Sequence, residues 1–203
     1  MVAEQIVPRG VRDPRLLAVM ETLPRHLFVP TDELAYAYAD GPLPIGHAQT
    51  ISQPFIVAWM TELLQLRGHE RVLEIGAGSG YQAAVLAKLA AEVYTVEIIP
   101  ELAARAVQVF RELEIANVHV HIADGTLGWP EHAPYDRILV AAAAPSAPEP
   151  LLGQLADGGR MVIPVGSRGL QVLEVWTRRG EKFHCEMNIG VAFVPLRGKY
   201  GWK

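Results

Sequence analysis

The sequence predicts an α/β fold with a seven-stranded, mostly parallel sheet and helices on both faces. Three observations lead to this prediction. Apolar, strand-like runs alternate with helix-like segments from residue 71 onward, as in sheets whose strands are joined by helical crossovers. Glycines 76, 78 and 80 lie where one such strand turns into a helix. The connection 166–169 is too short for a parallel crossover, so an antiparallel strand should follow near the C-terminal edge.

The first 68 residues are predicted to form a mainly helical segment that precedes the sheet and belongs to the same domain. Asp13 can cap a helix that has Pro14 at its first position, and a second short helix begins at Thr31. Residues 41–53 are expected to form a loop, because they contain two prolines and two glycines. The next helix, 54–66, should direct four apolar side chains toward a core: Ile56, Met60, Leu63 and Leu64.

The rest of the chain supplies the sheet. We expect strands at 71–75, 92–96, 118–123, 137–142, 160–165, 170–177 and 182–196. Helices are expected at 81–89, 100–113 and 149–156. Gly190 predicts a bulge or bend in the last strand.

The composition and charge of the chain argue against several classes of function. The chain has 203 residues, 50% of them hydrophobic, and a formal net charge of −4, which gives no electrostatic reason to expect a nucleic-acid partner. Its apolar stretches are far shorter than the roughly 18 residues of a membrane span, and the N-terminus has no signal-peptide core. We therefore expect a cytoplasmic protein, free of membranes. Cys185 is the only cysteine, so an intramolecular disulfide or a thiolate metal cluster is excluded.

Metal binding is not expected either. His119 and His121 share one face of a predicted strand, but no third ligand is apparent, and side-chain packing explains the pair better.

The glycine-rich segment points to a nucleotide-like ligand. Glycine permits positive φ and close approach of the backbone, while the following helix N-terminus offers unpaired N–H groups. A dinucleotide fingerprint, G-x-G-x-x-G/A, needs a small residue three positions after its second glycine. With Gly76 and Gly78 as the first two glycines, that position is occupied here by the large Tyr81, which follows Gly80. The spacing is instead E-x-G-x-G-x-G from Glu74 to Gly80, which resembles the first motif of class I S-adenosylmethionine-dependent methyltransferases.

Glu97 supports an adenosine ligand. It ends the second predicted strand, 21 positions after Gly76, where an acidic side chain can accept hydrogen bonds from both ribose hydroxyls. Both NAD and S-adenosylmethionine carry that ribose, so Glu97 alone does not choose between them. Glu97 could instead only precede the helix that starts at Pro100.

The junction 50–54, Thr-Ile-Ser-Gln-Pro, allows two interpretations. Ser52 or Gln53 could cap the helix that begins at Pro54. Alternatively, the Ser52 hydroxyl could serve a site.

Several segments together resemble the protein-L-isoaspartate O-methyltransferase family, and they cover nearly the whole chain. They are Thr-Ile-Ser-Gln-Pro at 50–54, Val-Leu-Glu-Ile-Gly-Ala-Gly-Ser-Gly-Tyr at 72–81, Ala-Asp-Gly at 123–125, Ala-Ala-Ala-Ala-Pro at 141–145, Gly-Gly-Arg-Met-Val-Ile-Pro-Val-Gly at 158–166 and Phe-Val-Pro-Leu at 193–196. Ala123 departs from the glycine that the family commonly has there.

The resemblance implies a Rossmann-like class I methyltransferase fold in a single domain, 1–203. Residues 1–68 would form an N-terminal helical lid and substrate segment, and residues 69–203 the cofactor-binding sheet. The implied reaction transfers a methyl group from S-adenosyl-L-methionine to the free α-carboxyl of an L-isoaspartyl residue, leaving S-adenosyl-L-homocysteine. The ester then collapses to a succinimide, which initiates repair. A carboxylate with a pKa near ~4 is already ionised at neutral pH, so no general base is needed.

The resemblance also implies roles for individual residues. Ser52 would be the catalytic residue, bound to the acceptor carboxylate, and Ala142 and Ala143 would leave room for a peptide backbone. Glu97 would hold the ribose, and Asp124 the adenine amine. The remaining implied cofactor contacts are Thr50, Ile51, Glu74, Gly76, Gly78, Ser79 and Gly125. Isoaspartyl proteins and peptides would be the substrates of a monomeric enzyme that uses no metal.

Three alternatives remain open at this point. A small-molecule methyltransferase would keep the glycine turn and act on catechols or amines. A non-catalytic adenosine-binding module would lack the acceptor site, against which Ser52 argues. A nicotinamide dehydrogenase is disfavoured by Tyr81.

Overall fold

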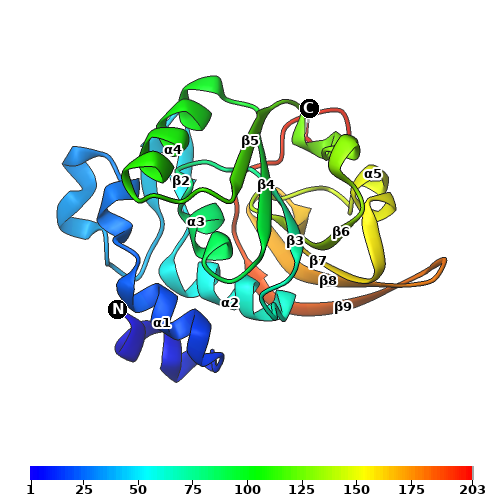
Figure 1. The fold of residues 1–203 in the computed structure, drawn as a ribbon, viewed down its shortest axis with the longest axis horizontal. Helices are drawn as coiled ribbons and strands as arrows, with labels where there is room; N and C mark the ends of the chain where they lie inside the picture. The colour runs from blue at the N-terminus through cyan, green and yellow to red at the C-terminus, as the bar shows by residue number, and fades with distance from the viewer. Residues whose placement is uncertain (203) are drawn as a thin grey trace.

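The computed structural model describes residues 1–202 and confirms the expected sheet (Figure 1). Its seven strands lie in the order β5-β4-β3-β6-β7-β8-β9. Their bounds are β3 Arg71–Ile75, β4 Glu92–Glu97, β5 Val118–Ile122, β6 Tyr135–Val140, β7 Leu155–Ser167, β8 Leu170–Arg179 and β9 Lys182–Val191. The α-helices are α1 Pro14–Thr22, α2 Pro54–Leu64, α3 Tyr81–Ala87, α4 Pro100–Glu112 and α5 Glu149–Gly153.

The chain also contains short helices of other types. A π-helical turn, η1, spans Val2–Ile6, and 3₁₀ turns are η2 Val7–Arg9, η3 Arg25–Phe28, η4 Thr31–Tyr36, η5 Gly125–Leu127 and η6 Pro130–His132. None of the helices in residues 1–202 combines the length and apolar character needed to cross a membrane.

The strand order at the centre of the sheet indicates where a ligand would bind. β3 pairs in parallel with β4 on one side and β6 on the other, so that Ile75 lies opposite both Val96 and Val140. The strand order therefore reverses at β3. In open α/β sheets, ligands bind at the carboxyl ends of the strands beside such a reversal.

The antiparallel end of the sheet follows from the short connection after β7. β8 runs antiparallel to β7, with Ser167 opposite Leu170 across the turn, and β9 runs antiparallel to β8. The register of β8 and β9 shifts between the pairs Val172–Gly190 and Glu174–Met187. This irregularity confirms the bulge expected at Gly190.

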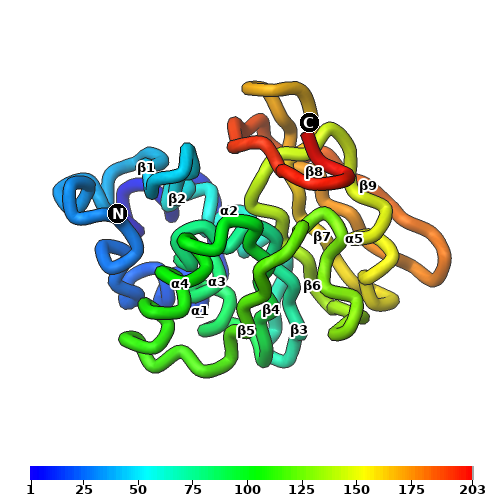
Figure 2. The backbone as a smooth tube through the Cα atoms, turned by 90° about the horizontal axis from the view of Figure 1, so that it is seen from above, coloured from blue at the N-terminus to red at the C-terminus, as the bar shows by residue number. Residues whose placement is uncertain are grey.

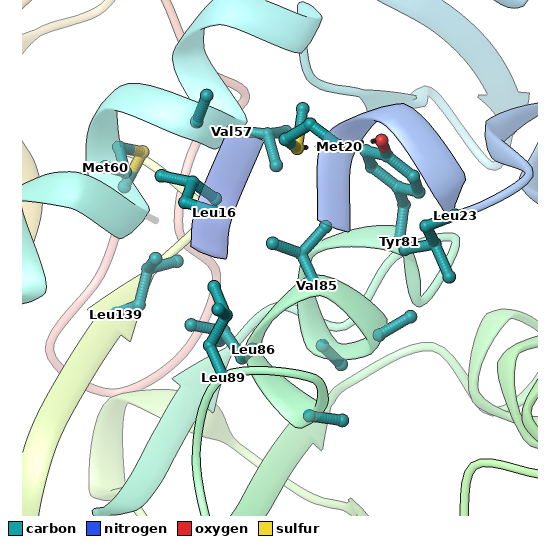
Figure 3. Close-up of a cluster of buried hydrophobic side chains, with 14 of the residues drawn as sticks. Leu16, Met20, Leu23, Val57, Met60, Tyr81, Val85, Leu86, Leu89 and Leu139 are labelled. Atoms are coloured by element: carbon teal, nitrogen blue, oxygen red, sulfur yellow. Dashed lines mark hydrogen bonds between the residues drawn. The ribbon is translucent and has the colours of Figure 1, made fainter. Parts of the chain in front are cut away.

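Two cores cover the two faces of the sheet. The larger contains side chains of α1 to α4 together with inward-facing residues such as Val72 and Leu139. Figure 3 shows Leu16 and Met20 of α1 between α2 and α3. The smaller core lies on the opposite face and joins Leu73 and alternate strand residues to Leu151 of α5. Because successive side chains of a strand point to opposite faces of the sheet, each strand contributes residues to both cores.

The N-terminal segment confirms two predictions, the cap at Asp13 and a short helix that begins at Thr31, and contradicts a third. Asp13 caps α1, because its side chain accepts a hydrogen bond from the backbone N–H of Arg15 at 2.9 Å. The expected loop 41–53, however, contains an antiparallel hairpin of β1 Leu43–Gly46 and β2 Gln49–Ile51. The turn uses His47 and Ala48, both at a φ of 54°, and these residue types give no turn signal in the sequence.

Helix α2 is shorter than expected and turned slightly differently. It ends at Leu64, because Gln65 adopts a left-handed conformation with φ 54°. Met60 and Leu64 are buried as predicted, whereas Ile56 and Leu63 are only half-buried, and Val57 points inward instead.

Candidate active site

A cavity of about 770 Å³, its open mouth included, lies at the carboxyl ends of β3, β4 and β6. Its walls come from β2 and the following Ser52, the glycine loop, the end of β4, and the C-terminal segment 194–197. In Figure 2 the β1–β2 hairpin and the C-terminal tail both lie along the upper border of the molecule. The predicted site residues in this lining are Thr50, Ile51, Ser52, Gly76, Gly78, Ser79, Glu97, Gly125 and Ala142.

The glycine loop has the backbone that its sequence requires. Gly76, Gly78 and Gly80 have φ values of 90°, 53° and 88°, a region that L side chains rarely adopt. Gly80 is needed for packing as well, because a Cβ there would lie 2.9 Å from Ala106 Cβ and Phe110 Cζ. The loop therefore opens its backbone toward the cavity while α3 and α4 stay in contact behind it.

Glu97 is fixed by the backbone of the loop that it faces. Its Oε2 accepts a hydrogen bond from the N–H of Gly78 at 2.8 Å, and its Oε1 accepts one from the N–H of Ile99 at 2.9 Å. The side chain is only 5% exposed but lines the cavity. Each carboxylate oxygen keeps acceptor capacity, so the pair can still receive two hydroxyl groups.

Glu74 lies apart from the predicted site residues that line the cavity. Its side chain is fully buried and is absent from the described lining, because it turns toward Thr95, its register partner on β4. The Thr95 hydroxyl donates to Glu74 Oε2, and Oε1 has no partner among the described residues. Burial, with a smaller contribution from the charge of Glu97, raises the pKa of Glu74 to about 8. Glu74 therefore lies beneath the described lining of the cavity.

Asp124 also lies outside the described lining, although its neighbour Gly125 is in it. Its Oδ1 accepts from the N–H and hydroxyl of Thr126 at 2.9 and 2.7 Å, and its Oδ2 from the N–H of Lys199 at 2.8 Å. Burial opposes ionisation, but these hydrogen bonds prevail and lower the pKa of Asp124. The C-terminal segment thus holds Asp124 at the edge of the cavity.

Ser52 does not cap the helix that follows it. The residue at the N-cap of α2 is Gln53, and no described side chain caps that end. Ser52 lines the cavity, and its backbone carbonyl accepts a hydrogen bond from Arg25 Nη2 at 2.7 Å. The capping interpretation is therefore wrong, and the hydroxyl is left available to the cavity.

Arg25 is a site residue that the sequence did not reveal. It is fully buried, donates from Nε to the carbonyl of Ala37 at 2.8 Å, and lies over the Tyr81 ring at 4.8 Å from its centroid. Burial lowers its pKa to about 10, so it remains a cation at neutral pH. An arginine in a short Pro-rich segment is normally exposed, and only the fold places this one under Ser52.

Ala142 and Ala143 follow β6 and lie in different walls. Ala142 lines the cavity just described, whereas Ala143 lines a second cavity beside it. The backbone of Ala143 is bonded to the C-terminal segment, through its N–H to Val194 at 2.8 Å and its carbonyl to Leu196 at 2.7 Å.

The two strand histidines pack on aromatic rings. The ring of His119 stacks on Tyr94 and that of His121 on Trp129, with centroids 4.9 and 4.6 Å apart. Within residues 1–202, no group of three or more His, Cys, Asp or Glu side chains is arranged to hold a metal ion.

Comparisons with known proteins agree with this geometry. A family model described as Protein-L-isoaspartate(D-aspartate) O-methyltransferase (PCMT) matches residues 1–201. A protein-L-isoaspartate O-methyltransferase of Methanoregula boonei is 57% identical over 203 residues, covering 100% of this chain and 94% of the relative. One of Dictyoglomus thermophilum is 53% identical over 202 residues, with 100% and 92% covered.

Solved structures give the same result. One described as a protein-L-isoaspartate O-methyltransferase has a TM-score of 0.89 at 28% identity, covering 99% of this chain and 67% of the other. A Plasmodium falciparum structure, described as such an enzyme in complex with S-adenosyl-L-homocysteine, has a TM-score of 0.83 at 25% identity, with 97% and 96% covered.

Proposed function

The chain belongs to the protein-L-isoaspartate(D-aspartate) O-methyltransferase family, and on that premise we propose how its residues carry out the reaction. The enzyme transfers a methyl group from S-adenosyl-L-methionine to isoaspartyl residues of damaged proteins and peptides, initiating their repair. The observation that carries the proposal is that Ser52 and Glu97 line one cavity, together with the glycine loop.

The cofactor would lie along the glycine loop. Glu97, already oriented by the N–H groups of Gly78 and Ile99, would accept hydrogen bonds from the two ribose hydroxyls. Gly76, Gly78 and Ser79 would contact the amino-acid end of the cofactor, and Thr50 and Ile51 would line its channel. Asp124 would meet the adenine amine beside the backbone of Gly125. Bound in this way, the cofactor supplies an electrophilic sulfonium methyl group.

Ser52 would act on the acceptor. Its hydroxyl would donate a hydrogen bond to one oxygen of the α-carboxylate and so direct the other oxygen toward the methyl carbon, in line with the sulfur. The new O–C bond forms as the C–S bond breaks, giving an ester and a neutral thioether. Because the nucleophile is already an anion, the residues need only to orient it and exclude water.

Substrate access would use the space left by small side chains. Ala142 in the wall of the first cavity, and Ala143 in that of the second, would leave room for a peptide backbone. The segment 1–68 would act as a lid and substrate segment over the sheet 69–203. We propose that the enzyme acts as a monomer.

A matched pair of peptides tests this function. One contains L-isoaspartate and the other normal aspartate at the same position, and transfer of a labelled methyl group is measured for both. We expect labelling of the isoaspartyl peptide alone. Equal labelling of both peptides, or transfer only to catechols or amines, would contradict it.

A further inference from the structure

Gln82 lines the proposed cofactor cavity alongside the glycine loop. It is the second residue of α3, directly after Gly80 and Tyr81, and it is only 9% exposed. Buried polar groups normally have hydrogen-bond partners. The partners of its amide therefore decide what this side chain can do in the cavity.

Helix α2 holds one side of the Gln82 amide. The hydroxyl of Thr61 lies 2.8 Å from the backbone carbonyl of Val57 and 2.9 Å from Gln82 Nε2. A carbonyl can only accept, so the single hydroxyl proton of Thr61 goes to Val57. The Thr61 oxygen must then accept from Gln82, which places the amide nitrogen, and not the amide oxygen, against α2. The hydrogen-bond network thus fixes the orientation of the amide.

The amide oxygen is left for the cavity. Among the described residues, no group donates a hydrogen bond to Gln82 Oε1. Within residues 1–202, this oxygen is also not one of the fully enclosed side-chain atoms that lack a partner. It therefore borders open space, and the open space that Gln82 lines is the cofactor cavity.

The position of this oxygen suits a cation with N–H donors. In the proposed function, the amino-acid end of the cofactor lies along Gly76, Gly78 and Ser79, which line the cavity together with Gln82. That end carries an α-ammonium group, which is a donor only and needs acceptors. Glu97, the one acidic residue of the described lining, is assigned to the ribose. Gln82 offers an acceptor beside the loop that is held in place and has no other described donor.

We propose that Gln82 Oε1 accepts a hydrogen bond from the α-ammonium group of S-adenosyl-L-methionine and so fixes the amino-acid end of the cofactor. This inference rests on the proposed function. Thr61 acts through Gln82, as a positioning residue that keeps the amide oxygen directed to the cavity. The product S-adenosyl-L-homocysteine carries the same ammonium group, so it is a stable probe of the contact.

Titration calorimetry with three ligands tests the contact without turnover. S-adenosyl-L-homocysteine has the ammonium group, its deaminated analogue keeps the carboxylate alone, and methylthioadenosine lacks the whole amino-acid end. Gln82→Met nearly keeps the length of the side chain but removes the acceptor. Its Kd for S-adenosyl-L-homocysteine should rise by about ten- to a hundredfold, the range for a hydrogen bond to a charged group. Its Kd values for the other two ligands should equal those of the wild type.

Further variants test the orientation of the amide. Thr61→Val removes the hydroxyl that accepts from Gln82 and should raise the Kd for S-adenosyl-L-homocysteine, but less than Gln82→Met does. Thr61→Ser keeps the hydroxyl and should restore the wild-type value. Gln108→Met makes the same change at an exposed position of α4, outside the described lining of the cavity, and should alter none of the affinities.

Several results would overturn the inference. An unchanged Kd of Gln82→Met for S-adenosyl-L-homocysteine would show that the oxygen does not bind the ammonium group. An equal loss for methylthioadenosine would show a general disturbance of the cavity. An increase confined to the KM of the isoaspartyl peptide would assign Gln82 to the acceptor, and an unchanged Kd of Thr61→Val would remove the positioning role.

Failure of this inference is distinct from failure of the proposed function. If the function is wrong, no isoaspartyl peptide is methylated in preference to its aspartyl partner. If only the inference is wrong, that preference is observed, and the loss of affinity specific to the ammonium group is absent from Gln82→Met.

Discussion

The guanidinium of Arg25 donates to the backbone carbonyl of Ser52 at 2.7 Å, from a position with no exposed surface. Its Nε holds the carbonyl of Ala37, and its flat face lies on Tyr81, the first residue of α3 after the glycine loop. One buried cation therefore connects the acceptor side of the site to the cofactor side.

Replacing Arg25 should disturb both stability and turnover. In Arg25→Met, two carbonyls lose their donors, each at a cost of about 1–3 kcal/mol when buried. We expect kcat to fall more than cofactor affinity, because Ser52 loses its support. Arg25→Lys keeps a cation but not the planar fork, and should recover part of kcat. Denaturant unfolding, turnover and calorimetry measure these effects; a loss of stability with normal kcat per folded molecule would limit Arg25 to folding.

Ser52→Ala should reduce turnover without loosening α2. Since no described side chain caps that helix, the free energy of unfolding should change by less than about 0.5 kcal/mol. A hydrogen bond to a charged group is worth about 1.5–3 kcal/mol, so kcat should fall by about ten- to a hundredfold. Ser52→Thr keeps the hydroxyl and should lose less. Transfer to an isoaspartyl peptide is the assay, and full activity of Ser52→Ala would exclude the catalytic role.

Glu97→Ala should weaken cofactor binding strongly. It removes two charge-assisted hydrogen bonds to the ribose, each worth about 1.5–3 kcal/mol, and leaves the N–H groups of Gly78 and Ile99 without their acceptors. Glu97→Gln keeps one acceptor oxygen and should have an intermediate affinity. Glu101→Ala, in the exposed first turn of α4, is the matched control. Unchanged affinity of Glu97→Ala in titration calorimetry would remove the ribose assignment.

Asp124→Ala should cost less affinity than Glu97→Ala, because one adenine contact is lost instead of two. The variant should also discriminate less against inosine-type cofactor analogues. Asp124→Asn retains one oxygen for Thr126 or Lys199 and separates the adenine contact from the loosening of the tail. Discrimination identical to wild type in both variants would show that Asp124 does not read the adenine amine.

Glu74 should make stability depend on pH. Its pKa is raised to about 8 in the folded state from an ordinary value near ~4.3 when unfolded, so the folded state holds more protons between these values. Stability is then fully present below the lower value and is lost as pH rises through about 8, by up to about 1.4 kcal/mol per pH unit. Glu74→Gln should flatten this slope in denaturant unfolding between pH 5 and 9; an identical slope would show that Glu74 ionises normally.

The sheet was predictable because its signals are local. Arg71–Ile75 contains Val72, Leu73 and Ile75 and is closed by Gly76, and the strand has these bounds. The antiparallel direction of the strand after Val165 followed from the shortness of the connection alone. The ends of elements that depend on tertiary contacts were not predictable: β7 begins at Leu155, five residues before the expected start.

The candidate site was only partly predictable, because burial and partners depend on distant segments. Ser52 and Glu97 reach the same cavity as expected. The motif position of Glu74 suggested contact with the cofactor, but its register opposite Thr95 turns it into the sheet. Arg25 carries no local signal, because its place under the site depends on Ser52, which is 27 residues away in the chain.

The edge strand β9 has a consequence for an enzyme whose substrates are damaged polypeptides. Nearly all of its side chains are exposed, and such an edge is a template on which unfolded chains can add a strand. Lys182 and Glu186 place charges along it, and the irregularity next to Gly190 breaks its regular spacing. Charges and irregularities of this kind disfavour edge-to-edge pairing, so β9 should resist the addition of a strand from a partly unfolded substrate.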